Sequence, residues 1–456
     1  MGTGVSGYRF PNDFLWGAST SAYQIEGGAQ ERGQTIWDRF CETPGKILGG
    51  HTGQTACDHR HHWREDVALM RELNLRSYRF SIAWARVLPE GSGRVSAAGL
   101  DFYRRLADEL SEAGIAPLAT LYHWDLPQAL QEQGGWENRD TARRFADYAA
   151  LLFAKLGDRV RLWITLNEPY VAAHLGYRTG EHAPGYRDEA KAVQVAHHLL
   201  LAHAWAVQTY RQMAAGGGRI GGRIGISLDL PWVQPATEQP DDRAAAERYE
   251  AYHNRWFLDP VFRGRYPEEL FSHFQSRHGA PRVQTGDLEA FAAAPVDFLG
   301  VNYYFRQLAR RPADPGQLFE VIQPDYPGAR FTSMGWEIWP EGLFEELRYL
   351  DREYGRPAMI VTENGAAFAD EPGTDGRVDD REREEYLSAH LQAAGRALAA
   401  GVRLQGYQVW SLLDNFEWAF GFNRRFGLVH VDFATQKRTP KSSALWYRRV
   451  IERGGV

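Results

Sequence analysis

Two glutamates, Glu168 and Glu363, stand out because each directly follows a run of apolar residues. A carboxylate at the end of an apolar strand costs free energy unless it is paired or has a chemical role. Two such carboxyl groups can cleave a glycosidic bond together, one as proton donor and the other as nucleophile or as the base that activates water. The sequence does not give their separation, which decides the stereochemistry. Two glutamates that pair with arginines for structural reasons remain an alternative.

Short β-rich apolar runs alternate with polar loops and with segments of helical period throughout the chain. This alternation is typical of parallel βαβ units. Residues 100–110 and 387–398 each carry one apolar stripe, because their apolar residues recur at steps of three and four. Eight strands are predicted to end near Tyr23-Gln24, Arg79-Phe80-Ser81, Leu121-Tyr122-His123, Thr165-Leu166-Asn167-Glu168, Ile226-Ser227-Leu228, Val301-Asn302-Tyr303-Tyr304, Val361-Thr362-Glu363-Asn364 and Val409-Trp410-Ser411.

This order of elements predicts an α/β protein with a (β/α)8 TIM barrel. A chain of 456 residues could hold two or three average domains, but a barrel with long loops also reaches this size. No linker or repeat divides the sequence, so we expect a single domain over residues 1–456 with elaborated active-site loops. The polar residues at the strand ends would then gather at the C-terminal mouth of the barrel, where barrel enzymes keep their active sites.

Several longer motifs carry a resemblance to a known family. Both glutamate segments, Thr165-Leu166-Asn167-Glu168-Pro169 and Val361-Thr362-Glu363-Asn364-Gly365, are similar to the two glutamate motifs of glycoside hydrolase family 1. Segments 14–27, 78–84, 121–127 and 410–418 resemble further motifs of that family, in the same order. The resemblance extends from about residue 10 to residue 447.

The resemblance implies a retaining mechanism in which Glu363 is the nucleophile and Glu168 is the acid/base. Family positions that support the nucleophile match Arg79, Asn302 and Tyr304. Sugar-binding positions match Gln24, His123, Asn167, Trp410, Glu417 and Trp418, with Trp410 as the platform beneath the sugar ring, and Trp336 matches a wall of the aglycone side.

The implied activity is hydrolysis of terminal β-D-glucosyl residues, with galactosides and fucosides left open as further substrates. Glu417 disfavours a 6-phosphoglycoside, since its charge would repel phosphate. Tyr170 stands where many family members have Trp, so the leaving-group preference is not predicted. A transglycosylating β-glycosidase of the same family is the nearest alternative. A non-catalytic carbohydrate-binding protein is another, although it would be expected to lack one of the two glutamates.

We predict no metal and no cofactor. The ligand-rich segment Asp58-His59-Arg60-His61-His62 precedes a predicted helix at residues 63–73, whereas catalytic ligands of barrel hydrolases lie at strand ends. His197, His198 and His203 are likewise predicted to lie on a helix.

Composition indicates a small uncharged partner. The net charge of −6 and the pI near 6.2 give no general reason to bind nucleic acid or an anionic membrane. No stretch of about 18 apolar residues occurs, and residues 1–16 do not resemble a secretion signal. Residues 1–6 fit a loose N-myristoylation pattern, but the pattern is so short that we expect an unmodified N-terminus.

The only cysteines, Cys41 and Cys57, suggest free thiols and a cytoplasmic location. The oligomeric state is not predicted.

Overall fold

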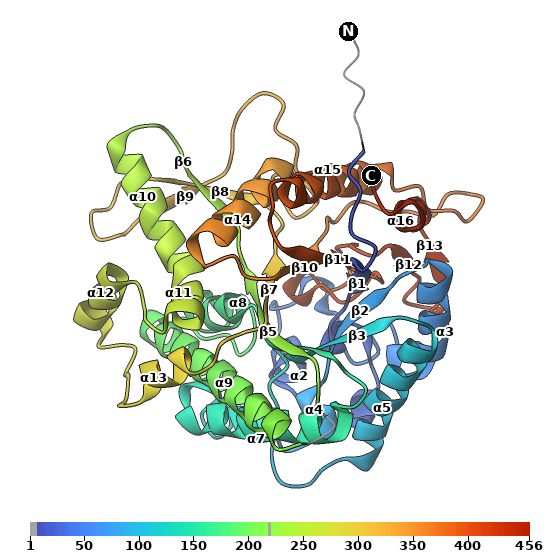
Figure 1. The fold of residues 1–456 in the computed structure, drawn as a ribbon, viewed down its shortest axis with the longest axis horizontal. Helices are drawn as coiled ribbons and strands as arrows, with labels where there is room; N and C mark the ends of the chain where they lie inside the picture. The colour runs from blue at the N-terminus through green and yellow to red at the C-terminus, as the bar shows by residue number, and fades with distance from the viewer. Residues whose placement is uncertain (1–6, 218–219) are drawn as a thin grey trace.

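The computed structural model describes residues 7–217 and 220–456, so the N-myristoylation pattern at residues 1–6 lies outside the described residues. Eight parallel strands close into a barrel, each hydrogen-bonded to its neighbours, with β11 returning to β1 (Figure 1). The predicted (β/α)8 barrel is therefore confirmed. In order around the barrel the strands are β1 (Leu15–Ser19), β2 (Ser77–Ser81), β3 (Ala116–Tyr122), β4 (Leu162–Asn167), β5 (Arg223–Asp229), β7 (Phe298–Asn302), β10 (Met359–Asn364) and β11 (Leu404–Trp410).

The first strand ends earlier than predicted. Ser19 is its last paired residue, opposite Arg79 of β2 and Trp410 of β11. The chain then turns, and Gln24 lies in the short helix α1 (Ala22–Ile25) instead of in the strand. All four residues of α1 are buried, so the segment lacks the exposed polar face by which a helix is usually recognised. Its largely apolar composition therefore did not distinguish a helical turn from the end of a strand.

Helices surround the barrel as an outer layer (Figure 1). The predicted stripe at 100–110 lies in α5, whose buried residues include Phe102, Leu106 and Leu110. The remaining α-helices are α2 (Ile36–Cys41), α3 (His59–Glu72), α4 (Trp84–Val87), α5 (Ala97–Glu112), α6 (Gln128–Gln131), α7 (Arg139–Leu156), α8 (Pro169–Ala173), α9 (Glu189–Ala215), α10 (Pro240–Glu250), α11 (Trp256–Arg263), α12 (Glu268–His278), α13 (Asp287–Ala292), α14 (Pro340–Glu353), α15 (Arg381–Ala399) and α16 (Ser442–Arg453). Four short 3₁₀ turns are η1 (Ala29–Glu31), η2 (Leu48–Gly50), η3 (Gly135–Glu137) and η6 (Trp418–Phe420), and two π-helical segments are η4 (His174–Thr179) and η5 (Ala251–Arg255).

Two small sheets lie outside the barrel. One joins β6 (Trp232–Pro235), β8 (Arg306–Arg310) and β9 (Glu320–Ile322), and the other pairs β12 (Val429–Val431) with β13 (Arg438–Pro440). Strands β6 and β8 follow directly after the C-terminal ends of β5 and β7. The additional sheet of β6, β8 and β9 therefore follows the C-terminal ends of the barrel strands, where the predicted site residues lie.

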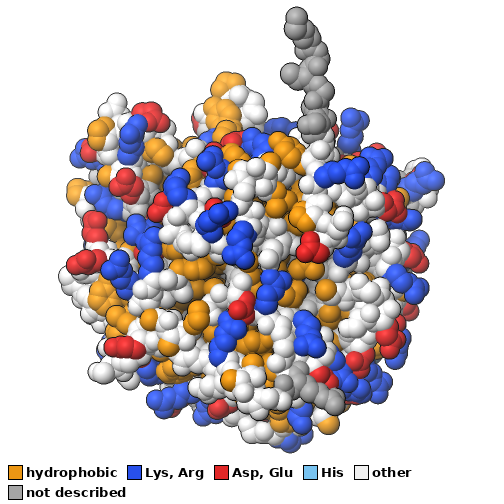
Figure 2. Space-filling model, in the orientation of Figure 1, with side chains coloured by type: hydrophobic (Ala, Val, Ile, Leu, Met, Phe, Trp, Pro, Cys, Tyr) orange, Lys and Arg blue, Asp and Glu red, His pale blue; other side chains and the backbone are white. Residues whose placement is uncertain are grey.

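The surface mixes positive, negative and hydrophobic side chains over the face shown in Figure 2. Within the described part of the chain, no helix combines the length and the apolar character that crossing a membrane requires.

A largely buried ion network involves the loop that follows β11. The Lys441 ammonium donates to Asp414 (2.7 Å) and to Asp370 (2.6 Å), and Arg383 pairs with Asp370 at 2.6 Å. Lys441 and Arg383 are completely shielded from solvent. Asp414 also accepts a hydrogen bond from Arg425 at 2.8 Å. Because Asp414 belongs to the loop that carries Glu417, the network ties that loop to the start of α16.

We expect Lys441→Met to destabilise the protein by about 3–5 kcal/mol, because it leaves buried carboxylates without their shared cation. Urea unfolding measures the change. Arg448→Met is the control, since Arg448 pairs with Glu452 at the surface of α16 with both side chains about half exposed. Such surface pairs contribute about 0–1 kcal/mol. Equal stabilities for the two variants would contradict a stabilising role for the Lys441 charge.

Candidate functional site

The two glutamates emerge at the same end of the barrel. Glu363 lies near the end of β10 and pairs in register with Asn302 of β7, whereas the backbone N–H of Glu168 donates to Ser227 O of β5 at 2.9 Å. Strands β4, β5, β7 and β10 are consecutive neighbours in the barrel. Glu168 and Glu363 therefore lie only three strands apart in space, although they are far apart in the sequence. Both side chains are buried, with 5% of Glu168 and 3% of Glu363 exposed.

Glu363 is held by a cation and a hydroxyl. It accepts hydrogen bonds from Nη1 of Arg79 and, at 2.7 Å, from the Tyr304 hydroxyl. Burial raises the pKa of Glu363, while the Arg79 charge and the Tyr304 hydrogen bond oppose that rise. Both contacts favour the ionised form of the carboxyl group and fix its direction.

Glu168 has a different environment. Its Oε1 atom accepts a hydrogen bond from the Asn302 amide at 2.6 Å. Burial raises the pKa of Glu168 well above its ordinary value, and the negative charges of Glu363 and Asp229 raise it further. We therefore expect Glu168 to hold a proton at neutral pH while Glu363 is ionised.

Asn167 connects the two carboxyl groups. Its Oδ1 atom accepts hydrogen bonds from Nη2 of Arg79 and from the Asn302 amide, the latter at 3.0 Å. A continuous chain of hydrogen bonds thus runs from Glu363 through Arg79, Asn167 and Asn302 to Glu168. The geometry of either glutamate consequently depends on the same three side chains.

The position of Asn302 differs from the prediction that grouped it with the supports of Glu363. Thr362 donates to Oδ1 of Asn302 at 2.7 Å, which directs the amide nitrogen of Asn302 toward Glu168 and Asn167. Strand β7 lies between β5 and β10, so a side chain at its end can turn toward Glu363 of β10 or across the end of β5 toward Glu168, which follows β4. The sequence could not distinguish these two directions.

Gln24 and Glu417 meet at the mouth of the barrel. The Gln24 amide donates to Asn415 Oδ1 (3.1 Å), to Phe416 O (3.0 Å) and, over 3.5 Å, to Glu417 Oε2. Burial and the charge of Glu363 raise the pKa of Glu417 to about 8. In this structure Glu417 is therefore mostly neutral at pH 7, whereas the sequence argument on phosphate repulsion assumed a charged carboxylate.

Aromatic rings enclose the same space. His123 stacks on Trp410 and Trp418, with ring centroids 5.8 and 6.0 Å apart, and its Nε2 atom lies 3.1 Å from the Asn167 amide nitrogen. Burial and the Arg79 charge lower the pKa of His123 well below its ordinary value, so the imidazole is neutral. Trp336 packs against the cluster that contains Tyr304 and Trp410, with its ring centroid 5.2 Å from that of Tyr304. All the residues predicted for the site thus lie near the strand ends.

Three residues at this mouth have left-handed backbones, with φ of 45° at Glu168, 75° at Trp124 and 47° at Trp418. Non-glycine residues adopt this conformation at a cost on the order of 1–2 kcal/mol, and such strain concentrates at functional sites. Trp124 and Trp418 pack against each other with centroids 4.7 Å apart, and Trp124 donates to Asn167 O at 2.9 Å.

Trp124, Asp229 and His253 were not predicted as site residues. Trp124 lies inside one of the resembling motifs, directly after His123, so its position could have indicated a role. Asp229 is the last residue of β5, one position beyond the predicted strand end, and an acidic residue there was an available signal. His253 comes from η5, far from any strand end, and only the tertiary structure brings it to Asp229.

The histidine-rich segment at residues 58–62 lies at the start of α3, as predicted, and not at a strand end. His59 hydrogen-bonds Asp66 at 2.7 Å, and His61 hydrogen-bonds Asp58 at 2.6 Å. His197, His198 and His203 lie in α9. Within residues 7–217 and 220–456, no group of three or more His, Cys, Asp or Glu side chains is arranged to hold a metal ion.

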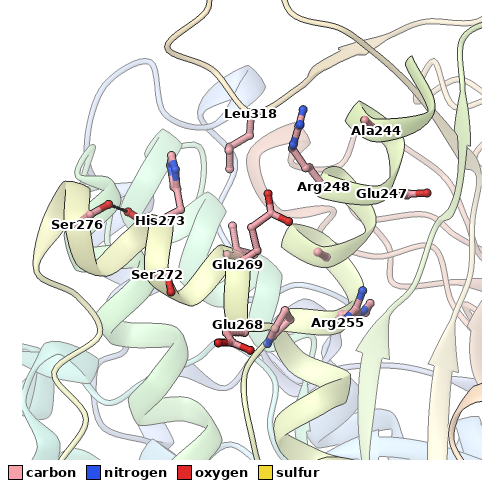
Figure 3. Close-up of a pocket in the computed structure, with 13 residues that line it drawn as sticks. Ala244, Glu247, Arg248, Arg255, Glu268, Glu269, Ser272, His273, Ser276 and Leu318 are labelled. Carbon is pink, nitrogen blue, oxygen red and sulfur yellow. Dashed lines mark hydrogen bonds between the residues drawn. The ribbon is translucent and has the colours of Figure 1, made fainter. Parts of the chain in front are cut away.

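A separate cavity of about 600 Å³ lies between α10 and α12 (Figure 3). Arg248, Glu269, His273 and Leu318 are among the side chains that line it, and both signs of charge are present. Neither of the two strand-end glutamates lines this cavity, so it is distinct from the cluster at the barrel mouth.

Comparison with known proteins agrees with this geometry. The family model for "Glycosyl hydrolase family 1" matches residues 6–456. The chain is 46% identical to "Beta-glucosidase A" of Acetivibrio thermocellus over 99% of this chain and 100% of that protein. It is 44% identical to the "Bifunctional beta-D-glucosidase/beta-D-fucosidase" of Bifidobacterium breve over 97% of this chain and 98% of that protein.

Solved structures show the same likeness. The family 1 β-glucosidase from Thermotoga maritima superposes with a TM-score of 0.93 at 46% identity and covers 99% of both chains. Sequence, fold and the paired strand-end glutamates agree, and this chain belongs to glycosyl hydrolase family 1.

Proposed function

We propose that this protein is a retaining β-glucosidase in which Glu363 is the nucleophile and Glu168 is the acid/base. The observation that carries the proposal is the contrast between the two environments. Glu363 is paired with Arg79, whereas Glu168 accepts from a neutral amide and lies near the negative charges of Glu363 and Asp229. Two carboxyl groups whose environments separate their pKa values are suited to the roles of nucleophile and acid.

In the first half-reaction, a carboxylate oxygen of Glu363 attacks the anomeric carbon. The bond from that carbon to the aglycone oxygen breaks, and the departing oxygen takes the proton of Glu168. The product is a glycosyl ester of Glu363, which carries no charge. Loss of that charge lowers the pKa of Glu168, which can now accept a proton.

In the second half-reaction, Glu168 removes a proton from water while the water oxygen attacks the anomeric carbon. The ester bond breaks, Glu363 regains its negative charge, and β-glucose leaves with its original configuration. The mutual dependence of the two carboxyl groups therefore lets one residue serve as acid and then as base.

For the sugar, we propose contacts with a set of polar groups and tryptophans that hydroxyl groups can satisfy: Gln24, His123, Asn167, Trp410, Glu417 and Trp418. Amides and carboxyl groups that hydrogen-bond a sugar hydroxyl disfavour sugars that lack this hydroxyl, because the buried polar groups would be left without a partner. Trp336 forms a wall on the aglycone side. We expect galactosides and fucosides as additional substrates, because the Bifidobacterium relative is named a bifunctional β-D-glucosidase/β-D-fucosidase and a Thermotoga structure holds galacto-hydroximolactam.

We further propose that residues 1–456 form one catalytic unit that acts on small uncharged glycosides, and not on nucleic acid. A cytoplasmic location is supported by the two free cysteines, Cys41 and Cys57. A reducing compartment keeps such thiols unpaired.

Initial rates on 4-nitrophenyl β-D-glucoside, galactoside, fucoside and 6-phosphoglucoside test the activity. We expect the glucoside to be cleaved with a kcat of about 1–1000 s⁻¹, in the ordinary range for enzymes. At about pH 9, above the pKa of about 8 of Glu417, the 6-phosphoglucoside should react about 100-fold more slowly, since the ionised Glu417 carboxylate repels the phosphate.

The products separate the alternatives. Equal amounts of glucose and nitrophenol, with β-glucose formed first by NMR, indicate retaining hydrolysis. A deficit of glucose relative to nitrophenol indicates transglycosylation. Binding of glucosides without turnover of any substrate would contradict the proposal and favour a non-catalytic carbohydrate-binding protein.

A further inference from the structure

Asp229 is an acidic residue close to the acid/base glutamate. It ends β5, pairs in register with Asn302 of β7, and lies two residues beyond Ser227, whose carbonyl oxygen accepts from the Glu168 N–H at 2.9 Å. Asn302 in turn donates to the Glu168 carboxyl group. Asp229 and Glu168 therefore occupy adjoining strand ends, and the Asp229 side chain is only 14% exposed.

His253 fixes the Asp229 carboxylate. Nε2 of His253 lies 2.9 Å from Oδ2 of Asp229, and Nδ1 lies 3.1 Å from the Tyr249 hydroxyl. Burial raises the pKa of Tyr249 well above its ordinary value, so its hydroxyl keeps its proton and can donate to Nδ1. The ring proton then resides on Nε2, from which it is donated to Asp229.

The same imidazole also contacts the segment that carries Glu168. Its ring stacks on Tyr170, with centroids 3.7 Å apart and planes inclined by 26°. Tyr170 is in α8, the helix that begins directly after Glu168. His253 thus hydrogen-bonds Asp229 through the edge of its ring and stacks with its ring face on Tyr170, which follows Glu168 by two residues.

We propose that Asp229, held by His253, is a positioning residue that keeps a negative charge beside Glu168 and thereby maintains Glu168 as the proton donor. The inference rests on the proposed function, because it concerns the acid step of glycoside cleavage. Neither Asp229 nor His253 touches the reacting atoms in this role. Their effect reaches the substrate through Glu168 and, because the Asp229 charge also raises the pKa of Glu363, to a smaller extent through Glu363.

The electrostatics around Glu168 support this role. Among the charges that act on Glu168, those of Glu363 and Asp229 raise its pKa and that of Arg79 lowers it. A buried charge acts on its neighbours with little screening by solvent. The titratable and charged groups that face the Glu168 and Asp229 carboxyl groups come from seven elements or strand ends: Glu363 (β10), Arg79 (β2), Tyr304 (after β7), Asp229 (β5), Tyr170 (α8), Tyr249 (α10) and His253 (η5).

Replacing Asp229 by asparagine tests the charge. The change keeps the size of the side chain and an oxygen that can accept from His253. Loss of the negative charge lowers the pKa of Glu168, so the alkaline limb of kcat/KM for an alkyl β-glucoside should shift to lower pH by about one unit. Asp229→Glu retains the charge and should retain the alkaline limb of the unmodified protein.

Asp297→Asn is the matched control. Asp297 precedes β7 at the opposite end of the barrel and pairs with Arg211 at 2.7 Å. This variant changes the net charge by the same amount and should leave the alkaline limb in place. A substrate whose leaving group needs no proton, 2,4-dinitrophenyl β-glucoside, should show little effect of Asp229→Asn on kcat/KM.

If Asp229→Asn lowers kcat/KM equally at every pH and for both substrates, Asp229 is merely structural and the inference is overturned. Such a result leaves the proposed function intact, because the unmodified protein in the same assay reports on glycoside hydrolysis. Should Asp229→Asn fail to fold, His253→Phe provides the second test. It keeps a ring against Tyr170 but frees Asp229 to turn toward solvent, so it should shift the limb in the same direction by less. An unmoved limb in this variant would also refute the inference.

Discussion

Glu363→Gln should lower kcat for aryl β-glucosides by a factor on the order of 10⁵, comparable to the loss of a covalent nucleophile in other hydrolases. The amide cannot form the glycosyl ester, although it keeps the size of the side chain. Its single oxygen can still accept from Arg79, and its NH2 group can donate to the Tyr304 hydroxyl, which accepts in place of donating. Initial rates at saturating substrate measure the loss. Far-ultraviolet circular dichroism and thermal unfolding establish that the variant is folded.

Glu346→Gln is the matched control for this substitution. Glu346 lies in α14, is 1% exposed, and has a pKa that burial raises well above its ordinary value. The carboxyl group is thus neutral, and an amide of the same shape should change kcat less than twofold, since Glu346 lies outside the proposed site. Parallel losses in both variants would indicate a general effect of altering buried glutamates.

Glu363→Ala with added azide gives an independent test of the nucleophile. Azide can enter the space left by the carboxylate, attack the anomeric carbon from that side and displace the activated leaving group of 2,4-dinitrophenyl β-glucoside. The product should be α-glucosyl azide, because this single displacement inverts the configuration. Formation of the β-azide would contradict the assignment of Glu363 as nucleophile.

Glu168→Ala should have the second-largest effect, and its size should depend on the leaving group. For cellobiose or an alkyl glucoside we expect kcat/KM to fall by about 10³–10⁴, the usual contribution of general acid catalysis. For 2,4-dinitrophenyl β-glucoside, kcat/KM should fall little, because that leaving group departs without a proton. A loss of the same size for both substrate types would argue against the acid role.

The pH dependence supplies a further criterion for Glu168. The protonated form is active in the first half-reaction, and the pKa of Glu168 is raised, so kcat/KM should fall as pH rises through that pKa. Ionisation of Glu363 should set the acidic limb. In Glu168→Ala, the alkaline limb should disappear for the dinitrophenyl substrate.

Azide should accelerate turnover of the dinitrophenyl substrate by Glu168→Ala and give β-glucosyl azide, since azide replaces water on the side that Glu168 vacates.

By itself, the amino-acid sequence predicted the barrel architecture and singled out the two glutamates that we propose as the reacting groups. The eight barrel strands were predicted from short apolar runs, and the outer helices from apolar steps of three and four, because these periodicities are local properties of the chain. Glu168 and Glu363 were recognisable because a carboxyl group directly after an apolar run is costly without a function. Their motifs identified the family, which the comparisons confirm.

Only the tertiary structure decided how these groups are tuned. The partner of Asn302, the raised pKa of Glu417, and the contact of His253 with Asp229 each depend on segments far apart in the sequence. Hydrogen-bond direction and pKa follow from distance, burial and neighbouring charge, none of which a linear pattern contains. Closure of the barrel brings these segments together, and that juxtaposition gives the two buried glutamates the different environments on which their proposed roles as nucleophile and proton donor rest.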